Sequence, residues 1–266
     1  MKKTITALAF ATTLVSACPC YCQYTDSLPV MQRDTLPAVI NWNTPASKKI
    51  FPYTSFILPA TLVVYGVTSL SVKPLGSINQ KIKEEVYTER SSAAKIHIDN
   101  YLQYSPALAV YALNLAGIQG KNNFRDRSMI YGLSELIMSS TVFTVKKFAG
   151  ETRPDGTDKY SFPSGHTANA FAAAEFMRQE YKDISPWYGV AGYAMAAATG
   201  YLRMYNNRHW MSDVAAGAGV GIISTKLAYW IYPAIKRKLF KNKEVSTMVM
   251  PSYQNGSIGL GMVHHF

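Results

Sequence analysis

Long stretches without charged side chains alternate with short polar and charged segments along this chain. Three runs carry no charge at all: residues 51–72, 100–120 and 184–202. Three more apolar stretches carry one interior charge each: residues 128–145, 167–176 and 214–235. Most of these lengths lie close to the roughly 20 residues that a helix needs to cross a bilayer. The pattern predicts an all-α fold, a membrane-associated bundle of about six helices.

Small residues are frequent in the last two of these stretches, where they let helix backbones approach closely in a membrane. The glycines concerned are Gly189, Gly192, Gly200, Gly217, Gly219 and Gly221. The same composition also suits a tightly packed soluble bundle. A mean hydropathy of −0.03 is low for six full spans, so partial immersion in the membrane is a second possibility.

The first residues have the order of a secretory signal. Two lysines at positions 2 and 3 precede an uncharged stretch over 4–17 and then Cys18, which predicts a signal peptide over residues 1–17. The sequence Val15-Ser16-Ala17-Cys18 also resembles a bacterial lipoprotein processing box. Two alternatives stay open, a lipid-bearing Cys18 or ordinary cleavage after Ala17. All three cysteines lie at positions 18–22, so the body is not expected to depend on disulfides.

The remaining chain divides into three parts by composition. Residues 18–50 are polar and contain prolines without a clear period, so they predict a loosely packed lead-in. Residues 51–243 form the predicted helical domain, with its core at 100–235. In residues 244–266, alternating side chains flank Asn255-Gly256, which predicts a C-terminal β-hairpin packed on the domain.

The chain is basic, with 27 Lys and Arg against 16 Asp and Glu and a formal net charge of +11. Such a balance suits nucleic acid, an anionic membrane surface or an anionic substrate. The export signal argues against nucleic acid. A basic cluster at 236–243 suits anionic lipid head groups or is a solvated helix end. No pattern in the chain specifies an oligomeric state.

Three short segments together predict a phosphate-transfer site. They are Lys146-x6-Arg153-Pro154, then Pro163-Ser164-Gly165-His166, and then Arg203-x5-His209-x3-Asp213. The first places two long cations at a helix end, where an Arg fork and a Lys point charge can meet one anion. The second is typical of a helix N-terminus with free backbone N–H groups, which favours a bound phosphate.

The third segment spaces an imidazole and a carboxylate four residues apart. On a helix, His209 and Asp213 would share a face, so the carboxylate can hold one ring nitrogen while the other attacks phosphorus. Arg203 would supply a further cation for the phosphoryl oxygens. Each segment alone has an ordinary explanation as a cap, a solvated cation or a surface pair. Their order and spacing make the joint interpretation the stronger one.

These motifs resemble the type 2 phosphatidic acid phosphatase family, whose relatives include bacterial acid phosphatases and vanadium haloperoxidases. The resemblance covers roughly residues 100–235 and departs from the family at Leu202, where a small residue is usual. It implies that His209 is a nucleophile oriented by Asp213, and that His166 protonates the leaving oxygen. It further implies a phosphate-binding set of Lys146, Arg153, Ser164, the Gly165 amide and Arg203. Nothing in the pattern requires a metal or another cofactor.

The function expected is therefore a phosphatase acting on a lipid-linked phosphate through a phosphohistidine. Substrates that fit are phosphatidic acid, phosphatidylglycerol phosphate, lipid A phosphate and polyprenyl diphosphate. The alternatives are a soluble periplasmic acid phosphatase of broad specificity, a vanadate-dependent haloperoxidase, and a non-catalytic lipid-binding membrane protein. Membrane-like helices and short loops argue against the haloperoxidase, and the presence of both histidines argues against the non-catalytic protein.

The orientation in a bacterial cell envelope has two opposing indications. Basic residues gather at the end opposite the motifs, which by the positive-inside tendency leaves the catalytic end outside. An exported N-terminus followed by a spanning segment 51–72 gives the reverse. Either that segment does not span or the body is only partly immersed. We expect a catalytic face toward the periplasm, because the signal has little other purpose.

Overall fold

The structure is a computed structural model that describes residues 53–87, 96–240, 247–254 and 257–264. The predicted signal peptide, Cys18 and the lead-in to residue 50 lie outside the described residues. The helical elements are η1 (Tyr53–Phe56), α1 (Ile57–Ser69), α2 (Lys73–Val86), α3 (Asp99–Leu102), α4 (Ser105–Leu115), α5 (Phe124–Ala149), α6 (Gly165–Tyr181), α7 (Pro186–Tyr205) and α8 (Met211–Phe240). The prediction of a mostly helical protein is confirmed.

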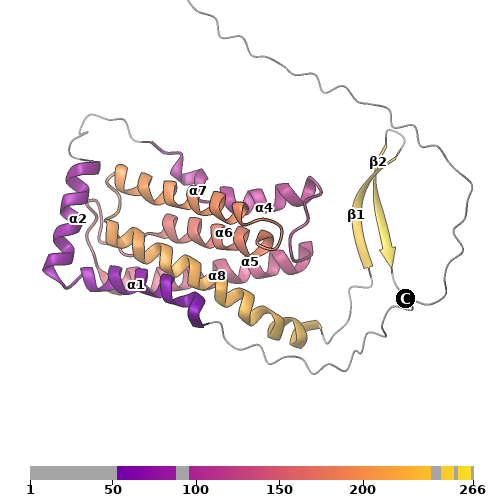
Figure 1. Ribbon diagram of the computed structural model, residues 1–266, viewed down its shortest axis with the longest axis horizontal. Coiled ribbons are helices and arrows are strands. Elements are labelled where there is room, and N and C mark those ends of the chain that lie inside the picture. The colour runs from indigo at the N-terminus through magenta and orange to yellow at the C-terminus, as the bar shows by residue number, and fades with distance from the viewer. Residues whose placement is uncertain (1–52, 88–95, 241–246, 255–256, 265–266) are drawn as a thin grey trace, which may run out of the picture. The chain divides into compact units, whose positions relative to one another are not determined.

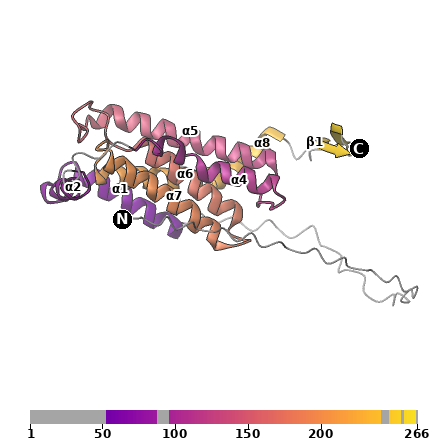
Figure 2. The same cartoon turned by 90° about the horizontal axis from the view of Figure 1, so that it is seen from above.

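Helix α6 is the centre of the helical part, with α4, α5, α7 and α8 packed around it and α1 against α8 (Figures 1 and 2). Its alanine-rich sequence permits this position, because small side chains let neighbouring helices approach from several sides. Buried residues occur all around α6, among them Ala168, Ala172, Ala174 and Phe176. The core thus forms along α6, and both ends of this helix are held by its neighbours.

Glycines on α8 bring that helix close to α6. A Cβ added at Gly217 would lie 2.5 Å from the carbonyl oxygen of Ser164, and one at Gly221 would collide with the backbone of Ala168. Only a residue without a side chain fits such a contact. The close approach predicted from the small residues is confirmed here, and it joins Ser164 to the helix that follows His209.

The helices differ in number from the predicted six. The described residues contain eight α-helices, so the six-helix bundle is not confirmed. The uncharged run 100–120 forms α3 and α4 rather than one helix, since Pro106 begins a new helix in its first turn and Gly117 is left-handed at φ 90°. Residues 73–86 form α2, which bends away from the preceding helix by 97°.

Two helices extend beyond their predicted bounds, and in α5 the caps at both ends explain the extension. Helix α5 starts after Asn123, whose side chain accepts a hydrogen bond from the Asp126 backbone, and it ends at the left-handed Gly150. Charged residues in its first and last turns are therefore part of the helix. Helix α6 likewise continues past the predicted residue 176 to Tyr181.

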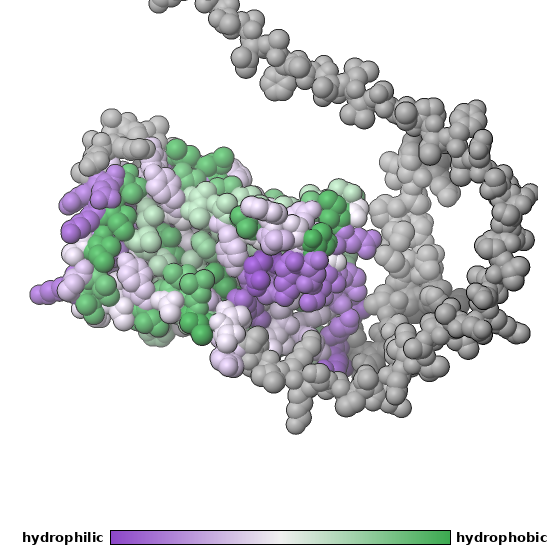
Figure 3. Space-filling view, in the orientation of Figure 1, coloured by the Kyte–Doolittle hydropathy of each residue, from purple (hydrophilic) through white to green (hydrophobic). Residues whose placement is uncertain are grey.

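Helices α5 and α8 are long and apolar enough to cross a membrane, and the bent pair formed by Tyr53–Ser69 and α2 would make a third such span. Large apolar side chains point outward along the helices, as in Leu108, Leu136 and Phe143, which are 64%, 64% and 73% exposed. Figure 3 shows hydrophobic residues over several parts of the face that this view presents, between hydrophilic groups. These features are those of a membrane protein.

Strands β1 (Thr247–Gln254) and β2 (Ser257–His264) pair antiparallel, with Gln254 opposite Ser257. The residues between them, 255 and 256, lie outside the described part. The predicted hairpin packed on the helical domain therefore stays a prediction.

Candidate active site

The three motifs meet where α5 and α7 end and α6 and α8 begin. The backbone N–H of Ser164 donates to the carbonyl oxygen of Asp213 at 3.0 Å, which joins the second motif to the third. The Lys146 ammonium donates to the carbonyl oxygens of Tyr160 and Ser161 at 2.6 and 3.3 Å, which joins the first motif to the loop that leads into the second. Segments nearly 70 residues apart thus share one end of the helical part.

The N-terminus of α6 has the predicted form. Ser164 is its N-cap, fully buried, and accepts a hydrogen bond from the Thr167 backbone while its hydroxyl lies 2.8 Å from the Thr167 hydroxyl. Gly165 begins the helix beside Lys146, since a Cβ at Gly165 would lie 4.0 Å from Lys146 Cε. A cation and a helix N-terminus therefore face the same small region, an arrangement that binds phosphate.

His209 and Asp213 meet, but not as two residues of one helix. Helix α8 begins only at Met211, so the expectation that both lie on a helical face is wrong for His209. The reason is a capping interaction: Asp213 Oδ2 accepts from the backbone N–H of Trp210 at 2.9 Å, which fixes Trp210 as the start of the helix. His209 Nδ1 lies 3.5 Å from Asp213 Oδ2, close but longer than a hydrogen bond.

The Asp213 carboxylate is also held from the other side. The hydroxyl of Ser161 donates to Oδ2 at 2.5 Å, and both side chains are completely buried. The imidazole of His209 is almost as deeply buried, with 4% of its residue surface exposed. The carboxylate that faces His209 is thus positioned by two donors before any substrate arrives.

His166 stands in the first turn of α6 and contacts α3. One of its ring nitrogens, Nε2, lies 3.0 Å from the Asn100 side-chain oxygen. Burial, followed by the nearby Arg203 charge, lowers the pKa of His166 from 6.5 to about 4. In the free protein this imidazole is neutral at physiological pH.

Each predicted arginine is paired with an acidic residue. Arg203 donates to Asp99 at 2.6 Å in a buried ion pair, and Arg153 donates to Asp158 at 2.9 Å. The Arg203–Asp99 pair replaces water around a charge that would otherwise be costly to bury. It also holds the guanidinium on the side of the helix end that carries His166.

The two histidines respond to the same set of charges. The pKa of His209 is lowered well below 6.5, first by burial and then by the charges of Lys146, Arg203 and Arg153, with a smaller contribution from His166. The same three cations lower the pKa of His166. Charges influence a pKa mainly over short distances. The structure therefore brings both histidines and all three cations into one region.

Unsatisfied polar atoms also concentrate here. Within the described residues, five buried side-chain atoms have no hydrogen-bond partner, and all five belong to this end of the structure: Asp99 Oδ1, Arg203 Nε, Asn207 Oδ1, His209 Nδ1 and Asp213 Oδ1. Buried polar groups are normally paired, so such a group calls for an explanation. The explanation is that these donors and acceptors are available to a bound phosphate and for proton exchange.

Several residues of the site have no sequence motif. Asp99, Asn100, Asp158 and Ser161 contact Arg203, His166, Arg153 and Asp213 respectively. Asp158 lies five residues after Arg153, so a local charge pair was a usable signal. Asp99 lies 104 residues before Arg203, and nothing in the local pattern announces that contact.

Comparison with known proteins gives one family and a small set of relatives. Residues 139–237 match the sequence profile of the PAP2 superfamily. The chain is 41% identical over 164 residues to the lipid A 1-phosphatase of Porphyromonas gingivalis, covering 60% of this chain and 36% of that protein. The chain thus spans about a third of the length of this relative.

Two solved structures are similar. The crystal structure of Aquifex aeolicus LpxE matches 57% of this chain and 95% of its own, with a TM-score of 0.44 and 20% identity. The PAP2 type phosphatidylglycerolphosphate phosphatase of Bacillus subtilis matches 68% of this chain and 98% of its own, with a TM-score of 0.47 and 22% identity.

Proposed function

Since residues 139–237 match the PAP2 superfamily, we propose that this chain is a metal-independent phosphatase that hydrolyses a lipid-linked phosphate through a phosphohistidine. The observation that carries the proposal is the convergence of a buried imidazole, His209, and a half-buried one, His166, with three cations near the N-terminus of α6. Charge concentration of this kind is what phosphoryl transfer requires. The catalytic domain is assigned to residues 51–243.

In the first step, His209 attacks the phosphorus atom. A lowered pKa keeps its ring neutral, so a nitrogen lone pair is available to form the N–P bond as the bond from phosphorus to the lipid oxygen breaks. His166, which becomes protonated when the dianionic phosphate is bound, gives its proton to that leaving oxygen. Asp213, 3.5 Å from Nδ1, stabilises the positive charge that develops on the His209 ring.

In the second step, water attacks the phosphohistidine. His166, now neutral, takes a proton from the water as its oxygen bonds to phosphorus, and the N–P bond breaks to return its electrons to His209. Inorganic phosphate leaves and both rings return to their starting states. Lys146, Arg153 and Arg203 stabilise the phosphoryl oxygens in both steps, with the Ser164 hydroxyl and the Gly165 amide as neutral donors.

The buried Nε of Arg203 suits this role. It has no hydrogen-bond partner among the described residues, although NH1 of the same guanidinium is bound to Asp99. Asp99 thus fixes the direction of the side chain and leaves a donor for a phosphoryl oxygen. Because this Arg side chain is already held in place, it loses little further mobility when a phosphate binds.

A lipid substrate is favoured by the surroundings of the site. Apolar, outward-facing side chains and two membrane-length helices bring the catalytic end to the membrane. A relative carries the name lipid A 1-phosphatase, so lipid A phosphate is the first candidate, beside phosphatidic acid, phosphatidylglycerol phosphate and polyprenyl diphosphate.

We further propose that the catalytic end faces the periplasm of a bacterial cell envelope. Helix α1 has 13 residues, or about 20 Å, and by itself is shorter than a hydrocarbon core of roughly 30 Å. If α1 does not span fully, the export signal and the positive charges at the opposite end agree on one orientation.

The function is tested by measuring phosphate release from a panel of envelope lipids with purified protein in detergent. The protein should hydrolyse lipid phosphates in the presence of EDTA, and vanadate should inhibit this activity. A His209→Ala variant should be inactive on all of the lipids. Activity that is lost with EDTA and restored by a metal would contradict the mechanism. A preference for small soluble phosphomonoesters would instead support an acid phosphatase.

A further inference from the structure

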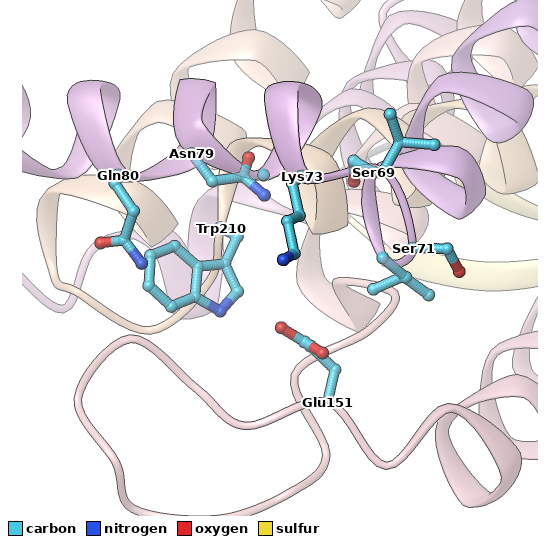
Figure 4. A pocket seen from close by; sticks show the side chains of 10 residues that line it. Ser69, Ser71, Lys73, Asn79, Gln80, Glu151 and Trp210 are labelled. Atoms are coloured by element: carbon cyan, nitrogen blue, oxygen red, sulfur yellow. The ribbon is translucent and has the colours of Figure 1, made fainter.

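A polar cavity of about 310 Å³ lies beside the candidate active site (Figure 4). One wall is the bend between α1 and α2, with Ser69 and Lys73, and α2 continues that wall with Asn79 and Gln80. The facing wall is made by Glu151 and Trp210. The volume is at the lower end of the range for small-molecule sites, roughly 300–1,000 Å³, so it suits one ring and its substituents.

This cavity lies next to the catalytic residues. A second, much smaller cavity shares Asn79 and Trp210 with it and is lined by His209. Trp210 follows His209 directly, and its backbone N–H binds the Asp213 carboxylate. A group attached to a phosphate at His209 would have to extend past Trp210 to enter this cavity.

The walls of the cavity are held in place by contacts outside it. The Asn79 side chain donates to the Ser212 hydroxyl at 2.9 Å and accepts from the Ser212 backbone at 3.1 Å, which fixes α2 on the start of α8. The Trp210 indole N–H donates to the carbonyl oxygen of Thr152 at 2.9 Å. The Lys83 ammonium, which does not line this cavity, lies 5.3 Å from the Trp210 ring centre. A site fixed before binding loses little freedom when a ligand enters.

Charge narrows the class of ligand. Lys73 and Glu151 point toward each other across the cavity (Figure 4), and the described residues include no ion pair between them within 4.0 Å. The Glu151 carboxylate would repel an anion in the cavity, and the Lys73 ammonium would repel a cation. A neutral group that both donates and accepts hydrogen bonds satisfies both side chains.

Leu70 and Val72 also line the cavity, but most of its lining side chains are polar, which favours a polar ring over an acyl chain. Side chains with amide, hydroxyl, ammonium and carboxylate groups would lose their water against a hydrocarbon chain without gaining a partner. A pyranose ring carries hydroxyl groups around its rim and C–H groups on its faces. The rim can bond to Lys73, Gln80 and Glu151, while a face packs against the large indole of Trp210.

We propose that this cavity binds the sugar ring that carries the phosphate, so that Lys73, Gln80 and Trp210 select phosphorylated glycolipids over phosphatidic acid. The inference rests on the proposed phosphatase activity and adds a specificity site to it. Neither Lys73 nor Gln80 contacts the proposed phosphate-binding residues in any hydrogen bond or ion pair within the described residues. Their substitution should therefore change substrate choice and leave the chemistry at His209 unchanged.

The test compares two lipid substrates in the same detergent: an acylated glucosamine 1-phosphate and phosphatidic acid. Lys73→Met and Gln80→Ala should each lower kcat/KM for the glycolipid by about tenfold through a higher KM, as expected for the loss of a hydrogen bond worth about 1.4 kcal/mol. Their kcat/KM for phosphatidic acid should match that of the wild type. Lys81→Met is the matched control, since Lys81 is an exposed residue of the same helix that does not line the cavity.

Three results would overturn the inference while the phosphatase function stands. Two concern the variants: an equal loss of activity on both lipids, or no loss on the glycolipid in either variant. Wild-type protein that hydrolyses phosphatidic acid but not the glycolipid would overturn it as well. Wild-type protein inactive on both lipids would refute the proposed function, and the specificity site with it.

Discussion

His166 is the residue whose protonation must change most during the proposed reaction. Its pKa of about 4 in the free protein makes it neutral, whereas the first step requires it to hold a proton. Burial and the positive charge of Arg203 are the main causes of the lowered pKa. A bound dianion offsets the positive charge of Arg203 and so raises the pKa of His166. The substrate itself would therefore supply the charge that protonates its acid.

This gives a prediction for the pH dependence of anion binding. Sulfate stays a dianion between pH 5 and 8, so a change in its affinity reports the protein. Because its binding raises the pKa of His166, sulfate binding takes up a proton, and its Kd should rise by up to about tenfold per pH unit as the pH increases. Sulfate inhibition measured at several pH values checks this.

A His166→Asn variant is the control for that measurement. The sulfate Kd of this variant should depend less on pH, by about one bound proton. Any pH dependence that remains would come from other groups such as His209. Equal dependence on pH in the variant and the wild type would contradict the proposed role of His166 as the proton donor.

At the same scale, sequence motifs predicted the chemistry but not its supports. Lys146, Ser164 and His166 belong to short segments whose residue types already indicate phosphate binding. Asp99 and Asn100 could not be recognised, because their partners lie 104 and 66 residues further along the chain. Such contacts depend on how the helices pack, and a local pattern carries no information on that.

At the scale of the elements, the contact between α6 and α8 sets the geometry of the site. The backbone bond from Ser164 to Asp213 lies close to Gly217, one of the positions where the two helices approach closely. We predict that Gly217→Ala lowers the free energy of unfolding by roughly 1–3 kcal/mol, because a methyl group there overlaps the Ser164 carbonyl oxygen. Phosphatase activity should fall as well.

Thermal unfolding in detergent measures the effect, and Gly132→Ala is the matched control. Gly132 lies on α5, and a Cβ there meets no heavy atom within 4 Å. This substitution should raise stability by roughly 0.5–1 kcal/mol through helix propensity alone. Equal effects of the two substitutions would mean that the close approach of α6 and α8 is not critical.

Helix positions were largely predictable, and their ends were less so. Apolar runs of the right length correspond to α5, α7 and α8. Asp213 shows why the ends were harder to predict: spacing suggested a helix that includes His209, whereas the bond from Trp210 to Asp213 starts the helix two residues later. The bend between α1 and α2, which forms the polar cavity, has no marker beyond Pro74 at the start of α2.

At the scale of the whole molecule, the orientation in the membrane decides which phosphates the site can reach. Lys81 on α2 belongs to the catalytic end, and Lys182 follows α6 at the other end; both are exposed. A membrane-impermeant maleimide should label Lys81→Cys in intact spheroplasts and Lys182→Cys only after lysis, once the labelling of the parent chain is subtracted. The reverse pattern would place the catalytic end in the cytoplasm.

The central claim is that His209 becomes covalently phosphorylated during turnover, and rapid quenching with a ³²P-labelled lipid phosphate tests it most directly. The account predicts protein-bound label that is stable in base and labile in acid, located on the peptide that contains His209 and absent from His209→Ala. Turnover without protein-bound label, or a His209→Ala variant that still releases phosphate at the wild-type rate, would contradict it.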